Sequence, residues 1–136
     1  MLVDANVWSE LVRPVPEPRV VDFLGRYRDS LFLSSIVVAE IEYGISNARD
    51  ETRRSRLRNF LEDTIILCAG RILLPDFATA AVFGSMKARL RTEGLPIDDI
   101  DLLIAAQAIV AAMPLATRNV SHLERTGATI VNPWNA

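Results

Sequence analysis

Met1-Leu2-Val3-Asp4-Ala5-Asn6-Val7-Trp8 opens the chain. Its first three residues are apolar and predict a short buried strand, and the residues from Asn6 onward predict a helix. An acid between a buried strand and a helix lies where open α/β sheets place their ligand-binding crevice. Asp4 is therefore a candidate functional residue. The alternative is that Asp4 only caps the helix, because aspartate is a favoured N-cap residue.

Short apolar strands alternate with helical segments along the rest of the chain. Strands are expected at residues 1–3, 31–33, 71–73, 115–117 and 129–131, and helices at residues 6–12, 17–28, 35–47, 52–68, 76–93 and 98–112. This alternation predicts an α/β fold in which helices cover a short-stranded, mainly parallel central sheet. No composition break marks a linker, so the 136 residues are expected to form one domain, residues 1–136.

The composition narrows the classes of protein. Lys and Arg number 15 against 17 Asp and Glu, a net charge of −2 that argues against a wholly basic nucleic-acid binder. One Cys and one His cannot build a disulfide or a Cys/His zinc site within one chain, so any metal would be bound by oxygen. The sequence shows no signal peptide and no membrane-spanning apolar run, and the cytoplasm is the expected compartment.

Glu40 is the second candidate acid. On a helix over residues 35–47 it lies in the middle of an apolar face, with Ile36 and Gly44 one turn away on either side. A buried unpaired carboxylate costs several kcal/mol, so Glu40 needs a cation, a partner or a site cavity. A buried ion pair with one of the arginines is the structural alternative.

Asp101 is the third candidate acid. The segment Asp98-Asp99-Ile100-Asp101 opens a predicted helix, and the helix dipole together with N-capping accounts for Asp98 and Asp99. Asp101 shares a stripe with the small residues Ala105, Ala108 and Ala112, so we expect it to point inward. Asn119, in Thr117-Arg118-Asn119, follows another predicted strand, where turn formation alone could explain it.

Inward carboxylates at one edge of a parallel sheet repel one another, and a hard divalent cation relieves that repulsion. Oxygen ligands suit Mg²⁺ or Mn²⁺. Such a site can activate water for attack on a phosphodiester, which makes a metal-dependent phosphodiesterase the hypothesis from the residues. The arginine-rich segment around Arg53 and Arg54 could contact RNA phosphates, although a solvated helix face is the simpler explanation for most of its charges.

Four segments, in order, resemble the motifs of the PIN-domain family, and in particular the VapC and FitB type toxins of bacterial toxin–antitoxin pairs. The resemblance spans the whole chain and includes an ending typical of the FitB branch. The segments are Leu2 to Val7, Leu33 to Gly44, Asp101 to Ala106 and Leu115 to Asn119, and the ending is Val131-Asn132-Pro133-Trp134.

The resemblance implies a three-layer α/β/α PIN fold and a Mg²⁺- or Mn²⁺-dependent endoribonuclease that acts as a toxin. Asp4, Glu40 and Asp101 match the family's first three acids as catalytic residues and metal ligands. Asn119 stands where many members carry a fourth Asp and adds no negative charge, so a second metal is not expected from it. Ala5 is a further departure, because Ser or Thr, whose hydroxyl could assist the site, is common there. The implied partners are a cognate antitoxin, an RNA substrate, operator DNA through the antitoxin, and a second copy of the chain.

Two other functions compete with the ribonuclease. One is a catalytically weak PIN-like binding module that acts only through its antitoxin and DNA complex. The other is a phosphohydrolase of the haloacid dehalogenase type with Asp4 as nucleophile, although Asn6 stands where that class has its second acid.

Overall fold

The computed structural model describes residues 1–136 and contains a five-stranded, fully parallel sheet. The strand order is β3-β2-β1-β4-β5. Every expected strand is present with each end within one residue of its predicted position, so the α/β prediction is confirmed. The strands are β1 (Leu2–Val3), β2 (Phe32–Ser34), β3 (Ile72–Leu73), β4 (Leu115–Ala116) and β5 (Ile130–Val131).

Seven α-helices and four short 3₁₀ helices surround the sheet. All six predicted helices are found, the first divided between α1 and η1. The helices are α1 (Ala5–Trp8), η1 (Ser9–Val12), α2 (Pro18–Arg26), η2 (Arg28–Ser30), α3 (Ser35–Ser46), α4 (Glu51–Leu67), α5 (Phe77–Thr92), α6 (Asp99–Val110), α7 (Val120–Leu123), η3 (Glu124–Thr126) and η4 (Pro133–Asn135).

The structure differs from the predictions in two places. Helix α7, which begins at Val120 directly after the turn expected at Asn119, was not predicted. The predicted inward stripe of α6 holds for Ala105 and Ala108, which are fully buried. It fails at Ala112, which is exposed, lies beyond the end of the helix and has a φ of 53°. The helix ends at Val110, with Ala111 in the C-cap position.

Polar side chains start the long helices. Ser34, the last residue of β2, accepts a hydrogen bond from the Ile36 amide at 3.1 Å and so turns the strand directly into α3. Asp50, Asp76 and Asp98 cap α4, α5 and α6 in the same way. Each cap satisfies an amide that would otherwise lack a partner in the first turn of the helix.

Strand β1 lies at the centre of the sheet and of the core. Leu2 and Val3 are fully buried, and Val3 is in register with Leu33 of β2 and Ala116 of β4. Burial of each such side chain contributes about 1.5–3 kcal/mol. The main core contains 22 buried residues drawn from the sheet and from helices on both of its sides. The start of the chain is therefore anchored, and Asp4 with it.

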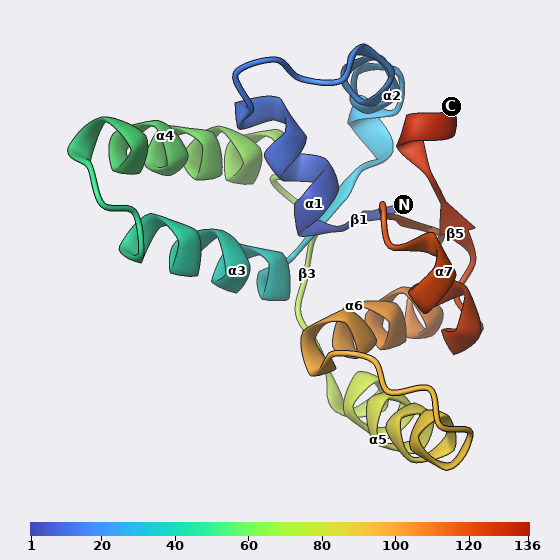
Figure 1. Cartoon of the computed structure of the whole chain (residues 1–136). Coiled ribbons are helices and arrows are strands. Elements are labelled where there is room, and N and C mark those ends of the chain that lie inside the picture. Colours follow the sequence, from blue (N-terminus) through green and yellow to red (C-terminus); the bar gives the residue numbers. More distant parts are fainter.

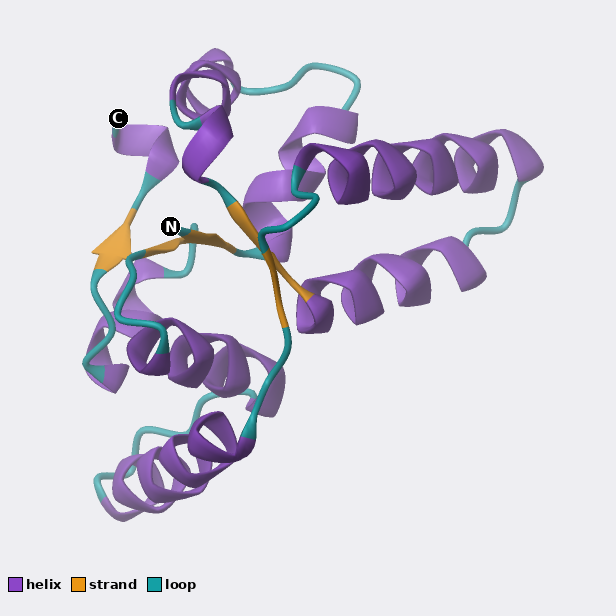
Figure 2. Cartoon of the chain, turned by 180° about the vertical axis from the view of Figure 1, so that it is seen from behind, coloured by secondary structure: helices purple, strands orange, loops and turns teal.

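Helices cover both faces of the sheet, as the layers in Figure 1 show. Helices α1 and α2 lie on one side of β1, while α6 and α7 lie on the other with α5 outside α6. Helices α3 and α4 form an antiparallel hairpin that projects away from the sheet, and Figure 2 shows it from behind. None of the helices is both long enough and apolar enough to cross a lipid bilayer.

The strand order creates one crevice. Strands β2 and β3 extend the sheet on one side of β1, and β4 and β5 extend it on the other. The order in which strands are added to the sheet therefore reverses between β1 and β4. Ligands of open α/β sheets bind outside the carboxyl ends of the strands at such a switch point. Asp4 directly follows β1 and Thr117 directly follows β4, so both residues lie at this crevice.

Candidate active site

The Asp4 carboxylate is buried and held by three hydrogen-bond donors. One oxygen accepts from the Ala5 amide at 2.7 Å, and the other accepts from Thr117 Oγ1 at 2.8 Å and from Asn6 Nδ2 at 3.0 Å. The side chain is only 3% exposed. Asp4 is thus the N-cap of α1, as the capping alternative predicted, and it also faces the crevice. The two roles coexist because one oxygen caps the helix and the other joins a polar network.

Asn6 and Thr117 form that network across the switch point. Asn6 accepts from the Arg118 amide at 3.1 Å through Oδ1, and Thr117 Oγ1 accepts from the Asn119 amide at 3.1 Å. Together they join the residues after β1 to those after β4, more than 110 positions later in the chain. Sequence reasoning gave neither residue this role, although both lie in the quoted motif segments. The network fixes the direction in which Asp4 points.

Glu40 and Asp101 lie on α3 and α6, and both are partly buried. Burial, followed by the negative charges of Asp4, Asp101 and Asp98, raises the pKa of Glu40 to about 7. Burial and the charges of Asp4 and Asp98 also raise the pKa of Asp101, and His122 opposes that rise. Burial likewise raises the pKa of Asp4 despite its hydrogen bonds. The three predicted acids therefore share one electrostatic environment.

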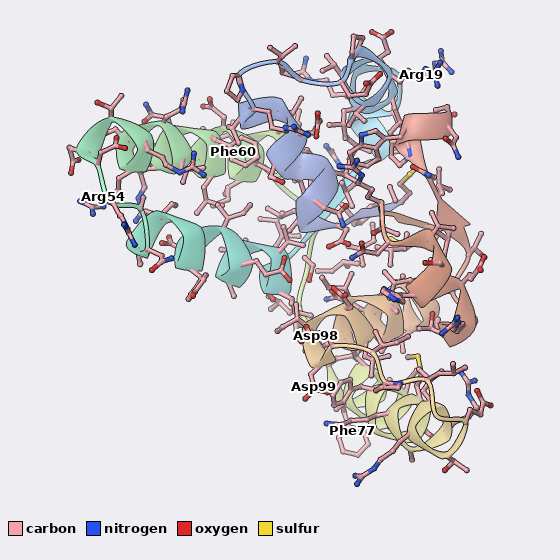
Figure 3. All side chains as sticks on the ribbon, in the orientation of Figure 1. Arg19, Arg54, Phe60, Phe77, Asp98 and Asp99 are labelled. Carbon is pink, nitrogen blue, oxygen red and sulfur yellow. The ribbon has the colours of Figure 1, made fainter.

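Asp98 belongs to this environment as well, although capping was expected to account for it. Its carboxylate does cap α6 by accepting from the Ile100 amide at 3.1 Å. Figure 3 places Asp98 at the start of α6, on the side that faces the first turns of α3. Asp99 instead pairs with Lys87 at 2.9 Å, as expected for an ordinary surface charge. In the sequence, the feature that could have indicated this for Asp98 was its position near Asp101 in an acidic helix start.

No basic side chain neutralises these acids. The five ion pairs of the structure involve none of Asp4, Glu40, Asp98 and Asp101. The buried ion pair that was the alternative for Glu40 is therefore not present. Burial and these unbalanced like charges together raise the pKa values of Glu40 and Asp101, and burial raises that of Asp4.

A hydrated divalent cation fits this donor set. No three acidic, His or Cys side chains converge closely enough to hold an ion by themselves. Mg²⁺ commonly needs only one or two carboxylates, keeps several waters and adds phosphate oxygens of a substrate. The acids thus lie close enough to influence one another electrostatically, but they do not form a complete set of metal ligands. Asn119 is partly buried near the site, and its side chain adds an amide without negative charge.

The structure separates the two arginines predicted to contact RNA. Arg54 pairs with Glu51 at 3.0 Å and donates to the Ala48 carbonyl oxygen at 2.7 Å. It lies at the far tip of the α3–α4 hairpin, away from Asp98 (Figure 3). Arg53 has no ion pair and lines a cavity of about 290 Å³ that also contains Glu40. Of the two arginines, only Arg53 is therefore near Glu40 and free to bind phosphate.

Comparison with known families gives one match that covers most of the chain. Residues 1–128 match the sequence profile of the family described as PIN domain. The match includes Asp4, Glu40, Asp101 and Asn119, which are the residues considered above.

Relatives of known name resemble the chain along its whole length. Toxin FitB of Neisseria gonorrhoeae is 34% identical over 99% of each chain. VapC ribonuclease Y4jK of Sinorhizobium fredii is 33% identical over 98% of this chain and 97% of its own. Plasmid stability protein StbB of Pseudomonas syringae pv. tomato is 33% identical over 100% and 99%, respectively.

Solved structures share the fold. The crystal structure of FitAcB from Neisseria gonorrhoeae superposes with a TM-score of 0.91 at 34% identity, over 99% of both chains. The structure of FitAB bound to an IR36 DNA fragment gives a TM-score of 0.88 at 35% identity, over 98% of this chain and 94% of that one.

Proposed function

The chain belongs to the PIN-domain family, and from that premise we propose that it is an endoribonuclease that acts as the toxin of a toxin–antitoxin pair. The observation that carries the proposal is the group of unpaired acids, Asp4, Glu40 and Asp101, at the switch point of the sheet. Full-length relatives named as a toxin and as a VapC ribonuclease support it. We expect the activity in the cytoplasm, where cellular RNA is found.

In the proposed site, Asp4 and Asp101 bind Mg²⁺ or Mn²⁺, and Glu40 assists. When bound, the cation would supply Lewis-acid activation of water and neutralise charge on the phosphate. Asp4 keeps its position because three donors fix its carboxylate. Glu40 would accept a proton from the attacking water. Asn119, at the edge of the site, would offer an amide that can accept a hydrogen bond but adds no negative charge.

The competing phosphohydrolase receives no support from this geometry. The residue two positions after Asp4 is Asn6, which donates a hydrogen bond to Asp4 and does not supply the second acid of that class. The binding module without activity remains the alternative that experiment has to exclude.

Cleavage of single-stranded RNA in the presence of Mn²⁺ tests the function directly. We expect the purified protein to cut short labelled RNAs in Mn²⁺ or Mg²⁺. Cleavage should stop in excess EDTA and resume when Mn²⁺ is restored. Gel analysis of the labelled products measures this. Intact RNA with every metal would favour the binding module, and cleavage that persists in EDTA would contradict the metal site.

The proposed partners are a cognate antitoxin, operator DNA reached through it, and a second copy of the chain. The related FitAB structure is bound to a DNA fragment, which supports the first two. Large apolar side chains that remain exposed, such as Phe77 at 90% and Leu74 at 70%, offer surface for a homodimer.

Arg53→Ala should weaken RNA binding about fivefold, whereas Arg54→Ala should leave it nearly unchanged. Arg53 is unpaired beside the acids, and the loss of one phosphate contact costs about 1 kcal/mol. Arg54 is already held by Glu51 and Ala48. Fluorescence anisotropy with uncut RNA in EDTA, over a range of salt concentrations, measures both variants. The salt dependence of Arg53→Ala should be shallower, and equal losses for the two variants would contradict the assignment.

A further inference from the structure

The cavity beside Glu40 lies between three helical segments. It has a volume of about 290 Å³ and is lined by residues of α1, α3 and α4 together with Ser9. Gly44 lies one helical turn after Glu40 on the same face of α3. A β-carbon at Gly44 would have no heavy atom within 4 Å, so the glycine leaves open space beside the acid.

The walls of the cavity combine an apolar surface with one positively charged side chain that forms no ion pair. Ile41, Leu57 and Phe60 line it as apolar side chains. Figure 3 shows Phe60 on α4, on the side that faces α1. Arg53 lines the same cavity and forms no ion pair. A flat aromatic group with a phosphate attached, such as a nucleotide, complements both features.

We propose that this cavity is a subsite for one nucleotide of single-stranded RNA next to the cleaved bond, with the base against Ile41, Leu57 and Phe60 and a phosphate at Arg53. This inference rests on the proposed ribonuclease function. It adds the place where one base is held, because the cavity is lined by Glu40 as well as by these apolar side chains. Recognition of an unstacked base in a side-chain pocket is the usual way in which proteins read single-stranded RNA.

Gly44→Leu tests the subsite by filling it. Gly84 of α5 provides a matched control, because it is also a helical glycine with open space at its β-carbon and lies outside the cavity. Leucine favours helix over glycine, so neither variant is expected to lose stability, and thermal unfolding checks this. We expect Gly44→Leu to lower kcat/KM for RNA cleavage about tenfold, and Gly84→Leu to change it less than twofold.

An abasic nucleotide identifies the occupant. The test compares how fast the wild type and Gly44→Leu cut, in Mn²⁺, RNAs that lack the base at one of the two positions flanking the cleaved bond. If the base occupies the cavity, removing it slows the wild type about tenfold at one of the two positions. The same removal then has little effect on Gly44→Leu, because both changes remove the same interaction and their effects do not add.

The outcomes separate this inference from the function on which it rests. Additive losses, or a Gly44→Leu variant that cuts RNA as fast as wild type, would overturn the subsite while the ribonuclease stands. In that case a protein partner, and not a nucleotide, would be the expected occupant of the cavity. A wild type that cuts no RNA would overturn both.

Discussion

Asp4→Asn is expected to lower RNA cleavage about a thousandfold or more while the protein stays folded. Asparagine keeps an oxygen that can accept from the Ala5 amide, so the cap of α1 survives. It removes the negative charge that the proposed site needs, and a loss of about 4 kcal/mol in transition-state stabilisation gives this factor. Cleavage of labelled RNA in Mn²⁺ and circular dichroism measure the two effects.

Asp22→Asn supplies the control, since Asp22 is an exposed acid of α2 and should tolerate the change without loss of activity. Without metal, Asp4→Asn should be as stable as wild type or more stable, because it relieves repulsion among the acids. An Asp4→Asn protein that unfolds would show that the hydrogen bonds of the Asp4 carboxylate to Thr117 and Asn6 are its main, structural role. One that cleaves RNA normally would refute the site.

Glu40→Gln should stabilise the metal-free protein at pH 8 by about 1–2 kcal/mol, and the gain should vanish near pH 4.5. The folded state raises the pKa of Glu40 from 4.5 to about 7, so the native protein binds a proton more tightly than the unfolded chain does. Stability from this group therefore falls as pH rises between those values and stays reduced above pH 7. The magnitude allows for solvent screening at this partly exposed site.

Urea unfolding in EDTA at pH 4.5 and pH 8 measures this difference. Glu62→Gln provides the control because Glu62 is exposed on α4 and forms no ion pair. The control should gain no stability as pH rises. A Glu40→Gln gain that is equal at both pH values would show that burial of a polar side chain, rather than its charge, is the origin of the effect.

The positions of the three acids could be predicted because each depends on a local pattern. Asp4 ends an apolar run, Glu40 interrupts an apolar helix face, and Asp101 lies one turn into a helix that is otherwise apolar. Family motifs then joined them into one site. The strands and long helices followed from the same periodicity and from their caps. Helix α7, with four residues, is too short to show any period.

The remaining features depend on contacts that no local pattern contains. Arg54 pairs locally with Glu51, three residues earlier in the same helix, but the position of Arg53 beside Glu40 depends on how α4 packs against α3. Asn6 and Thr117 meet because β1 and β4 are adjacent in the sheet, which the order of the strands along the chain does not reveal. Tertiary topology, rather than composition, placed these residues.

The backbone at the centre of the site is part of the sheet itself. The Asp4 amide donates to the Ala116 carbonyl oxygen at 2.9 Å, and the Thr117 amide donates to that of Val131 at 3.0 Å. Amides in central strands of a core exchange with solvent mainly through global unfolding. The backbone that holds Asp4 and Thr117 is therefore expected to persist as long as the fold does. A molecule that occupies or covers the site would control its activity without disturbing that backbone.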